Sequence, residues 1–224
     1  MEPKLSWSVE KVARLIDDTE VTLDAPRSRI TAFCESALKH SFRAACVLPI
    51  WVNLAADIVR GSNTAVAATV GTFGDTLPTL TVAIRDCIAR GADEFDVLIS
   101  LGALKSGDWE TVARYMRCAV EAADGRSVKL MLEMGLLTEA EKARACELSV
   151  ETGISCVKTS TGRLSSGATV EDVSLMRRIV GDRLDVKASG GIRTFQDVVR
   201  MVEAGASRIG TSRGAGILAT VPTQ

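Results

Sequence analysis

Two lysines placed in short apolar segments are the residues of this sequence best suited to chemistry. Lys158 lies in the segment CVKTST and Lys187 in the segment DVKASGG. Lysine is rarely buried unless it is paired or used, and both burial and a second nearby ammonium disfavour its charged form. A neutral amine near pH 7 can attack a carbonyl and form a Schiff base. The pair therefore predicts covalent amine catalysis, and the residues alone leave open which lysine is the nucleophile.

Three carboxylates accompany these amines. Asp96, Asp17 and Glu133 each lie in or next to the later part of a short apolar segment. Asp96 would balance one ammonium and relay protons during a reaction. The alternative is that the lysines simply form ion pairs with these three carboxylates. Because two lysines and several carboxylates are expected at the same end of the fold, we favour chemistry over purely structural pairing.

Glycine-rich segments follow the last three of the predicted strands. In many barrels the backbone amides of such loops, with a nearby helix N-terminus, bind the phosphate of a ligand. Tight turns between strand and helix also require glycine, which is the simpler explanation for any single one. Three consecutive loops of this kind, two followed by arginine (Arg163 and Arg193), favour a phosphate site. Its candidate residues are Gly162, Arg163, Gly190, Gly191, Gly210 and Ser212.

Eight short apolar runs are the elements that must position these residues. They do not alternate strictly between apolar and polar, which is typical of parallel strands buried on both faces. The predicted strands are Arg14–Thr19, Ala44–Pro49, Ala65–Gly71, Asp93–Ser100, Ser127–Met134, Ser155–Thr161, Leu184–Ser189 and Ser207–Ser212. Helical patterns fill the intervals, at Pro26–Lys39, Thr79–Arg90 and Asp108–Ala123 and after the capping residues Thr138, Thr169 and Thr194.

Strand and helix alternate along the whole chain. Eight such units predict the α/β class and a (β/α)8 TIM barrel, as a single domain over residues 1–224 with a loose tail from about residue 219. A doubly wound open sheet is the alternative, weakened because no GxGxxG motif follows the first strand. In a barrel the site lies at the carboxyl ends of the strands, where the residues above are found.

Composition excludes several classes of protein. The chain has 27 basic and 28 acidic residues, a net charge of −1 and a single histidine. General nucleic-acid binding needs a basic excess, and histidine-rich zinc sites need more than one histidine. The six cysteines form no CxxC pair, the N-terminus lacks an apolar signal region, and no apolar run reaches the length of a membrane span. We therefore expect a cytoplasmic protein with reduced thiols and with no nucleic-acid or membrane partner.

Several of these segments together resemble the deoxyribose-phosphate aldolase family. The similarity runs in order along nearly the whole chain, and the two lysine motifs are its most specific part. The matching segments are LIDDT at 15–19, AACVLP at 44–49, GADEFDVLISLGALKSGDW at 91–109, VKTSTG at 157–162, VKASGGIRT at 186–194 and RIGTS at 208–212.

The resemblance implies a Schiff-base (class I) aldolase with a barrel fold and without metal or cofactor. It implies reversible cleavage of 2-deoxy-D-ribose 5-phosphate to acetaldehyde and D-glyceraldehyde 3-phosphate, and a homo-oligomer, most often a dimer. By position, Lys158 matches the Schiff-base lysine, Lys187 the lysine that perturbs it and Asp96 the proton-relay carboxylate. The substrate-binding and phosphate-binding positions match Asp17, Cys46, Gly162, Arg163, Gly190, Gly191, Gly210, Ser212 and Arg213, the last in place of a serine.

Two alternatives to this function remain. One is a divergent aldolase with the same Schiff base that acts on another aldehyde or sugar phosphate. The other is a barrel that binds a sugar phosphate without catalysis. Intact Lys158, Lys187 and Asp96 argue against the second, because a protein that only binds its ligand does not need a neutral amine.

Overall fold

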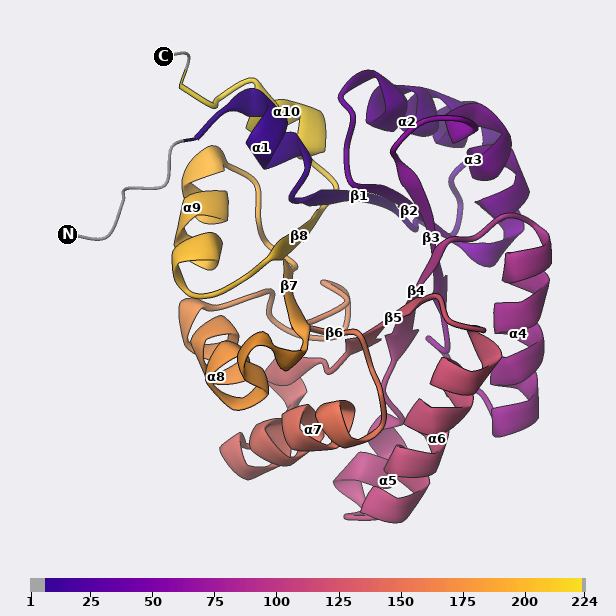
Figure 1. Ribbon diagram of the computed structural model, residues 1–224, viewed down its shortest axis with the longest axis vertical. Coiled ribbons are helices and arrows are strands. Elements are labelled where there is room, and N and C mark those ends of the chain that lie inside the picture. Colours follow the sequence, from indigo (N-terminus) through magenta and orange to yellow (C-terminus); the bar gives the residue numbers. More distant parts are fainter. Residues whose placement is uncertain (1–6, 223–224) are drawn as a thin grey trace.

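Eight parallel strands close into one barrel in the computed structural model, which describes residues 7–222 (Figure 1). Neighbouring strands pair in chain order, and the last strand pairs with the first. The predicted (β/α)8 barrel is therefore confirmed, and each predicted run overlaps one strand. The strands are β1 (Ile16–Glu20), β2 (Ala44–Val47), β3 (Ala65–Val70), β4 (Glu94–Leu98), β5 (Ser127–Met131), β6 (Cys156–Lys158), β7 (Asp185–Ser189) and β8 (Arg208–Thr211).

Helices surround the barrel as an outer layer (Figure 1). The predicted ones are α2 (Arg27–Lys39), α4 (Leu77–Ala89), α6 (Trp109–Ala122), α7 (Glu139–Glu151), α8 (Val170–Val180) and α9 (Phe195–Glu203). The side chains of Thr138, Thr169 and Thr194 cap α7, α8 and α9 as expected. Four further helices were not predicted from the sequence: α1 (Val9–Ala13), α3 (Val52–Val59), α5 (Leu101–Lys105) and α10 (Gly214–Leu218). Three of these span only five residues, and α3 has no side-chain cap.

Each strand presents one face to the helices and the other to the barrel interior. The outer faces carry apolar side chains such as Val66, Val97 and Leu130, which belong to the main hydrophobic core. Inside, β2 and β3 contribute small side chains, among them Ala44, Cys46 and Ala67. These small residues leave room for long charged side chains from the other strands, so the barrel interior is polar where its outer surface is apolar.

The two ends of the described chain meet beside the first and last strands. Helices α1 and α10 lie side by side there (Figure 1). We expected a loose tail from about residue 219, but Val221 is only 6% exposed and belongs to the hydrophobic core. An apolar side chain that finds a buried position keeps this part of the tail in place.

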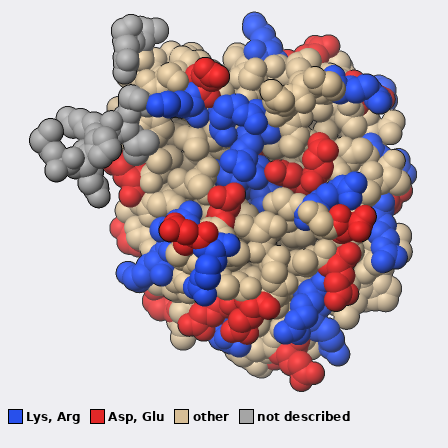
Figure 2. All heavy atoms as spheres, viewed as in Figure 1, with Lys and Arg blue, Asp and Glu red and all other residues tan. Residues whose placement is uncertain are grey.

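Two surface properties agree with the composition. Basic and acidic side chains are interspersed over the face shown in Figure 2, in keeping with the net charge of −1. Within residues 7–222, no helix is both long and apolar enough to cross a membrane.

Asp18, on β1, faces the outer layer at the junction with α10. Its Oδ1 accepts a hydrogen bond of 3.2 Å from the backbone N–H of Gly214, at the start of α10. The side chain is 6% exposed. Burial raises the pKa of Asp18 to about 6, against the opposing effect of hydrogen bonds from Gly214 and Thr19.

This raised pKa predicts a pH-dependent stability. A carboxyl whose pKa is higher in the folded chain than in the unfolded chain costs stability once it ionises, and the cost grows as pH rises from about 4 through about 6. Asp18→Asn can keep the Gly214 hydrogen bond without the charge. We expect its free energy of unfolding to exceed that of the wild type by about 2 kcal/mol at pH 8 and by much less at pH 4.5. Urea denaturation measures both, and an equal difference at the two pH values would contradict the assignment.

Candidate active site

Lys158 and Lys187 meet on one carboxylate oxygen inside the barrel. Lys158 Nζ donates to Asp96 Oδ2 at 2.7 Å, and Lys187 Nζ donates to the same oxygen at 2.9 Å. Lys158 and Lys187 are in register on β6 and β7, and in-register residues of adjacent strands point to the same face. Lys158 is 3% exposed, whereas Lys187 and Asp96 are fully buried. The three predicted catalytic residues are therefore brought together.

The surroundings of Asp96 and Lys187 keep both side chains charged. Burial by itself would raise the pKa of Asp96, but the ammonium groups of Lys129, Lys158 and Lys187 hold it well below its usual value. Burial would lower the pKa of Lys187, yet the carboxylates of Asp17 and Asp96 outweigh it and raise that pKa above the ordinary value. The expectation of a lowered pKa therefore does not hold for Lys187, because two carboxylates contact its ammonium.

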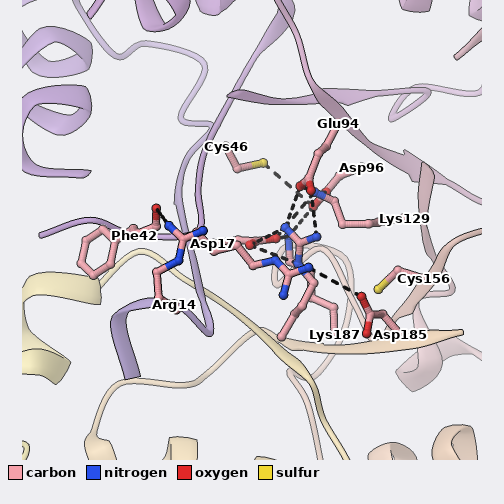
Figure 3. Close-up of polar contacts among 12 residues, drawn as sticks. Arg14, Asp17, Phe42, Cys46, Glu94, Asp96, Lys129, Cys156, Asp185 and Lys187 are labelled. Carbon is pink, nitrogen blue, oxygen red and sulfur yellow. Dashed lines mark hydrogen bonds and ion pairs between the residues drawn. The ribbon is translucent and has the colours of Figure 1, made fainter. Parts of the chain in front are cut away.

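Three further charged residues, which the sequence analysis did not single out, complete the cluster. Lys129 Nζ lies 3.0 Å from Asp96 Oδ1 and 2.7 Å from Glu94 Oε2. Arg208 Nη2 lies 2.6 Å from Glu94 Oε2 and 2.7 Å from Asp17 Oδ1. Figure 3 shows Asp17, Glu94, Asp96, Lys129 and Lys187 converging from their strands. In the segment SVKLM, Lys129 follows a valine within an apolar run, just as Lys158 and Lys187 do. This shared context could have identified Lys129 as a third lysine inside the barrel.

Asp17 and Cys46 lie within the barrel interior. Asp17 is fully buried, and its Oδ2 contacts Lys187 Nζ at 2.6 Å. Cys46 Sγ lies 3.2 Å from Thr69 Oγ1 and 3.9 Å from Asp96 Oδ2 (Figure 3). Burial and the Asp96 charge raise the pKa of Cys46, so its thiol stays protonated. Asp17 is thus a partner of the lysines, and Cys46 is a neutral neighbour of Asp96.

A cavity of about 330 Å³ lies at the carboxyl ends of β6, β7, β8 and β1. Ser189, which lines it, follows Lys187 by two residues on β7, and Thr161, which also lines it, comes three residues after Lys158 in the loop that follows β6. Two residues of strand span roughly 7 Å, so the lysines lie directly below the cavity. It brings together the predicted phosphate-binding residues Gly162, Arg163, Gly190, Gly191, Gly210, Ser212 and Arg213.

Arginines make the cavity cationic. Arg29 is paired with Glu20 at 2.6 Å, and Arg163 donates to the carbonyl oxygen of Val21 at 2.5 Å. Within residues 7–222, no hydrogen bond or ion pair engages the guanidinium groups of Arg193 and Arg213, which also line the cavity. A cavity with this excess of positive charge suits a phosphate or another anion.

Local backbone geometry holds the loop between β6 and α8 over the lysines. Gly190 has φ of +94°, and a Cβ there would lie 2.8 Å from Gly167 Cα, so glycine is required. Glu133, in the left-handed region with φ of 57°, is fully buried. Its carboxylate accepts from Thr161 N at 2.9 Å and from Ser165 Oγ at 2.6 Å. Glu133 therefore anchors the loop and forms none of the lysine pairs considered above.

Together these groups can carry out carbonyl chemistry on an anionic ligand. The cavity would hold the anion, and the Lys158 amine and the Asp96 carboxylate to which it is hydrogen-bonded lie below it. An amine in this position can add to a carbonyl, and the carboxylate can accept and return protons.

Comparison with known proteins points the same way. The model of a family described as DeoC/LacD family aldolase matches residues 43–219. A Brevibacillus brevis protein named deoxyribose-phosphate aldolase is 45% identical over 212 residues, covering 94% of this chain and 96% of its own. A Bacillus cytotoxicus protein of the same name is 45% identical over 210 residues, covering 92% and 94%. The Aeropyrum pernix deoxyribose phosphate aldolase, whose structure is described as tetrameric, aligns with a TM-score of 0.88 at 28% identity, covering 95% of this chain and 91% of its own.

Removal of the shared carboxylate should destabilise the fold. Asp96→Asn takes away the group that Lys129, Lys158 and Lys187 contact. Because breaking a buried ion pair leaves uncompensated charge, we expect the free energy of unfolding to fall by about 3–5 kcal/mol in urea at pH 7. The matched control is Asp57→Asn, whose pair with Arg60 is 58% and 77% exposed, and which should cost less than about 1 kcal/mol. Equal stability of the two variants would be inconsistent with this network.

Proposed function

Because the chain belongs to the DeoC/LacD family of aldolases, we propose that it cleaves 2-deoxy-D-ribose 5-phosphate reversibly through a Schiff base on Lys158. The products are acetaldehyde and D-glyceraldehyde 3-phosphate, which makes the protein a carbon–carbon lyase. The Brevibacillus brevis and Bacillus cytotoxicus relatives carry the name of this activity. The observation that carries the proposal is the 2.7 Å contact between Lys158 Nζ and Asp96 Oδ2, buried directly below the cationic cavity.

Binding positions the open-chain sugar. The phosphate lies against the glycine-rich loops and the guanidinium groups of Arg193 and Arg213, at the cavity end of the site. The aldehyde carbon C1 then extends toward Lys158. Because the phosphate takes no part in the bond changes, its binding energy serves to orient the reacting carbonyl.

Schiff-base formation uses Lys158 and Asp96. The neutral amine attacks C1, and Asp96 passes the proton that the nitrogen loses to the former carbonyl oxygen, which gives the neutral carbinolamine. A second proton, delivered from solvent through Asp96 and an intervening water molecule, lets the carbinolamine hydroxyl leave as water and forms the iminium. The later hydrolysis of the iminium returns this proton to solvent. Lys187 stays an ammonium throughout and favours the return of Asp96 to its carboxylate form after each transfer.

Cleavage follows from the positive charge of the iminium. The C3 hydroxyl loses its proton to Asp96 acting through water, the C2–C3 bond breaks, and its electron pair moves into the enamine. D-glyceraldehyde 3-phosphate leaves as the first product. Protonation of the enamine at C2 and addition of water to the resulting iminium release acetaldehyde and restore Lys158.

Assembly and location complete the proposal. We infer a homo-oligomer that acts on small sugar phosphates and aldehydes; the one assembly described among the relatives cited here, from Aeropyrum pernix, is a tetramer, and nothing favours the expected dimer. A cytoplasmic location is supported by six free cysteines, five of which are buried.

Reductive trapping tests the nucleophile. Acetaldehyde followed by borohydride should add the mass of one ethyl group to Lys158, because reduction makes the Schiff base permanent. Peptide mass spectrometry locates the adduct. Lys158→Ala should lose both adduct and turnover, whereas Lys105→Ala, at an exposed lysine paired with Glu141, should keep both.

The same experiment separates the alternatives. An adduct on another lysine would overturn the assignment of Lys158. Binding of the sugar phosphate without any adduct would favour the non-catalytic barrel. EDTA should leave turnover unchanged, because no step uses a metal ion.

Arg213 should distinguish phosphorylated from unphosphorylated substrates. Arg213→Ser removes one charged donor from the cavity, so we expect KM for 2-deoxyribose 5-phosphate to rise about tenfold, equivalent to about 1.4 kcal/mol. The kcat/KM for unphosphorylated 2-deoxyribose should change little. Arg178→Ser, at an exposed position on α8 outside the cavity, is the control. If both substrates lost activity equally, Arg213 would have no part in phosphate binding.

A further inference from the structure

Six charged side chains inside the barrel form a closed ring of alternating sign. Lys129 lies 3.0 Å from Asp96 and 2.7 Å from Glu94. Arg208 lies 2.6 Å from Glu94 and 2.7 Å from Asp17. Lys187 lies 2.6 Å from Asp17 and 2.9 Å from Asp96, which closes the ring. We call this set the charge ring. It takes residues from β1, β4, β5, β7 and β8.

The charge ring is electrically balanced without Lys158. It holds three carboxylates and three cations, so its formal charge is zero. Lys158 is attached from outside, on an Asp96 oxygen that already accepts from Lys187. An ammonium on Lys158 would be a fourth cation, 3% exposed and without a carboxylate of its own. Losing that proton leaves the cluster balanced, and a buried unbalanced charge is unfavourable.

Two members of the charge ring act far from the amine. Glu94 and Arg208 are the first residues of β4 and β8, at the opposite end of these strands from the cavity. The charged or titratable side chains facing Lys158 are Asp96 and Lys187, with Lys129 and the protonated Cys46 beside Asp96. Glu94 and Arg208 therefore influence Lys158 only through the field and the positions of the other members.

Resting on the function proposed above, we propose that Glu94 and Arg208 are positioning residues that close the charge ring. Each cation of the closed ring then contacts at least two of its carboxylates, whereas Lys158 contacts Asp96 alone and shares that carboxylate with the ring. Glu94 and Arg208 thereby select the nucleophile. Lys187, inside the ring, is held by two carboxylates, while Lys158, at the end of β6 nearest the cavity, is the amine left to meet the carbonyl. This choice follows from charge and geometry, independently of sequence similarity.

The test compares the pH dependence of Schiff-base formation in four proteins. The rate of trapping by acetaldehyde and borohydride is measured against pH for the wild type, Glu94→Gln, Arg208→Gln and the double variant. Loss of the Glu94 charge leaves a positive excess, so the midpoint should move to lower pH by about one unit; loss of the Arg208 charge should move it by about one unit to higher pH. The double variant restores the balance and should return close to the wild-type midpoint.

A structural role for the two residues gives a different result. Loss of packing would lower the rate or the stability in both single variants while moving the midpoints the same way or not at all, and that result overturns the proposal. Arg208→Lys, which keeps the charge, should retain the wild-type midpoint.

If a single variant does not fold, the double variant decides between the outcomes. Folding with a wild-type midpoint supports the proposal, and failure to fold overturns it. Absence of any adduct in the wild type would instead refute the aldolase function itself.

Discussion

The buried charge ring is the constraint on which the rest of the site depends. Charges enclosed this deeply are tolerated only when opposite charges replace the water they have lost. The six contacts, none longer than 3.0 Å, require five strands to keep one register. A shift of one residue would turn Asp96 or Lys129 toward the helices. The interior also needs space, which Ala44, Cys46 and Ala67 provide on β2 and β3.

The candidate catalytic residues of this barrel lie on strands, whereas most residues that line the cavity lie in loops. The amine and its carboxylate belong to strands, whose hydrogen-bonded neighbours fix them on both sides. The proposed anion site is formed by the loops above, where sequence change is easier to accommodate. Glu133 joins the two levels, because it is buried after β5 and holds the loop that carries Arg163. A change of preferred substrate can therefore occur in the loops without disturbing the chemistry below.

Prediction from the sequence succeeded where local pattern carries the information. Eight apolar runs and their capped helices define a barrel, and lysines within apolar runs pointed to Lys158 and Lys187. Lys129, Glu94 and Arg208 were not predicted, because a barrel is expected to carry its site at the carboxyl ends of its strands, whereas these residues begin or lie within theirs. Their roles come from pairing across the barrel, which no local pattern reports. The same holds for Asp17, whose place in the interior depends on Lys187 and Arg208.

The contact between Asp17 and Arg208 joins residues 191 positions apart, from the first strand and the last. A chain that lacks β8 also lacks Arg208, so this side of Asp17 has no partner and the charge ring cannot close. Hydrated lysines are ordinary protonated lysines with little reactivity toward carbonyls. Under the proposed function, the pairing of β8 with β1 is therefore also the step that would complete the environment of the reactive amine.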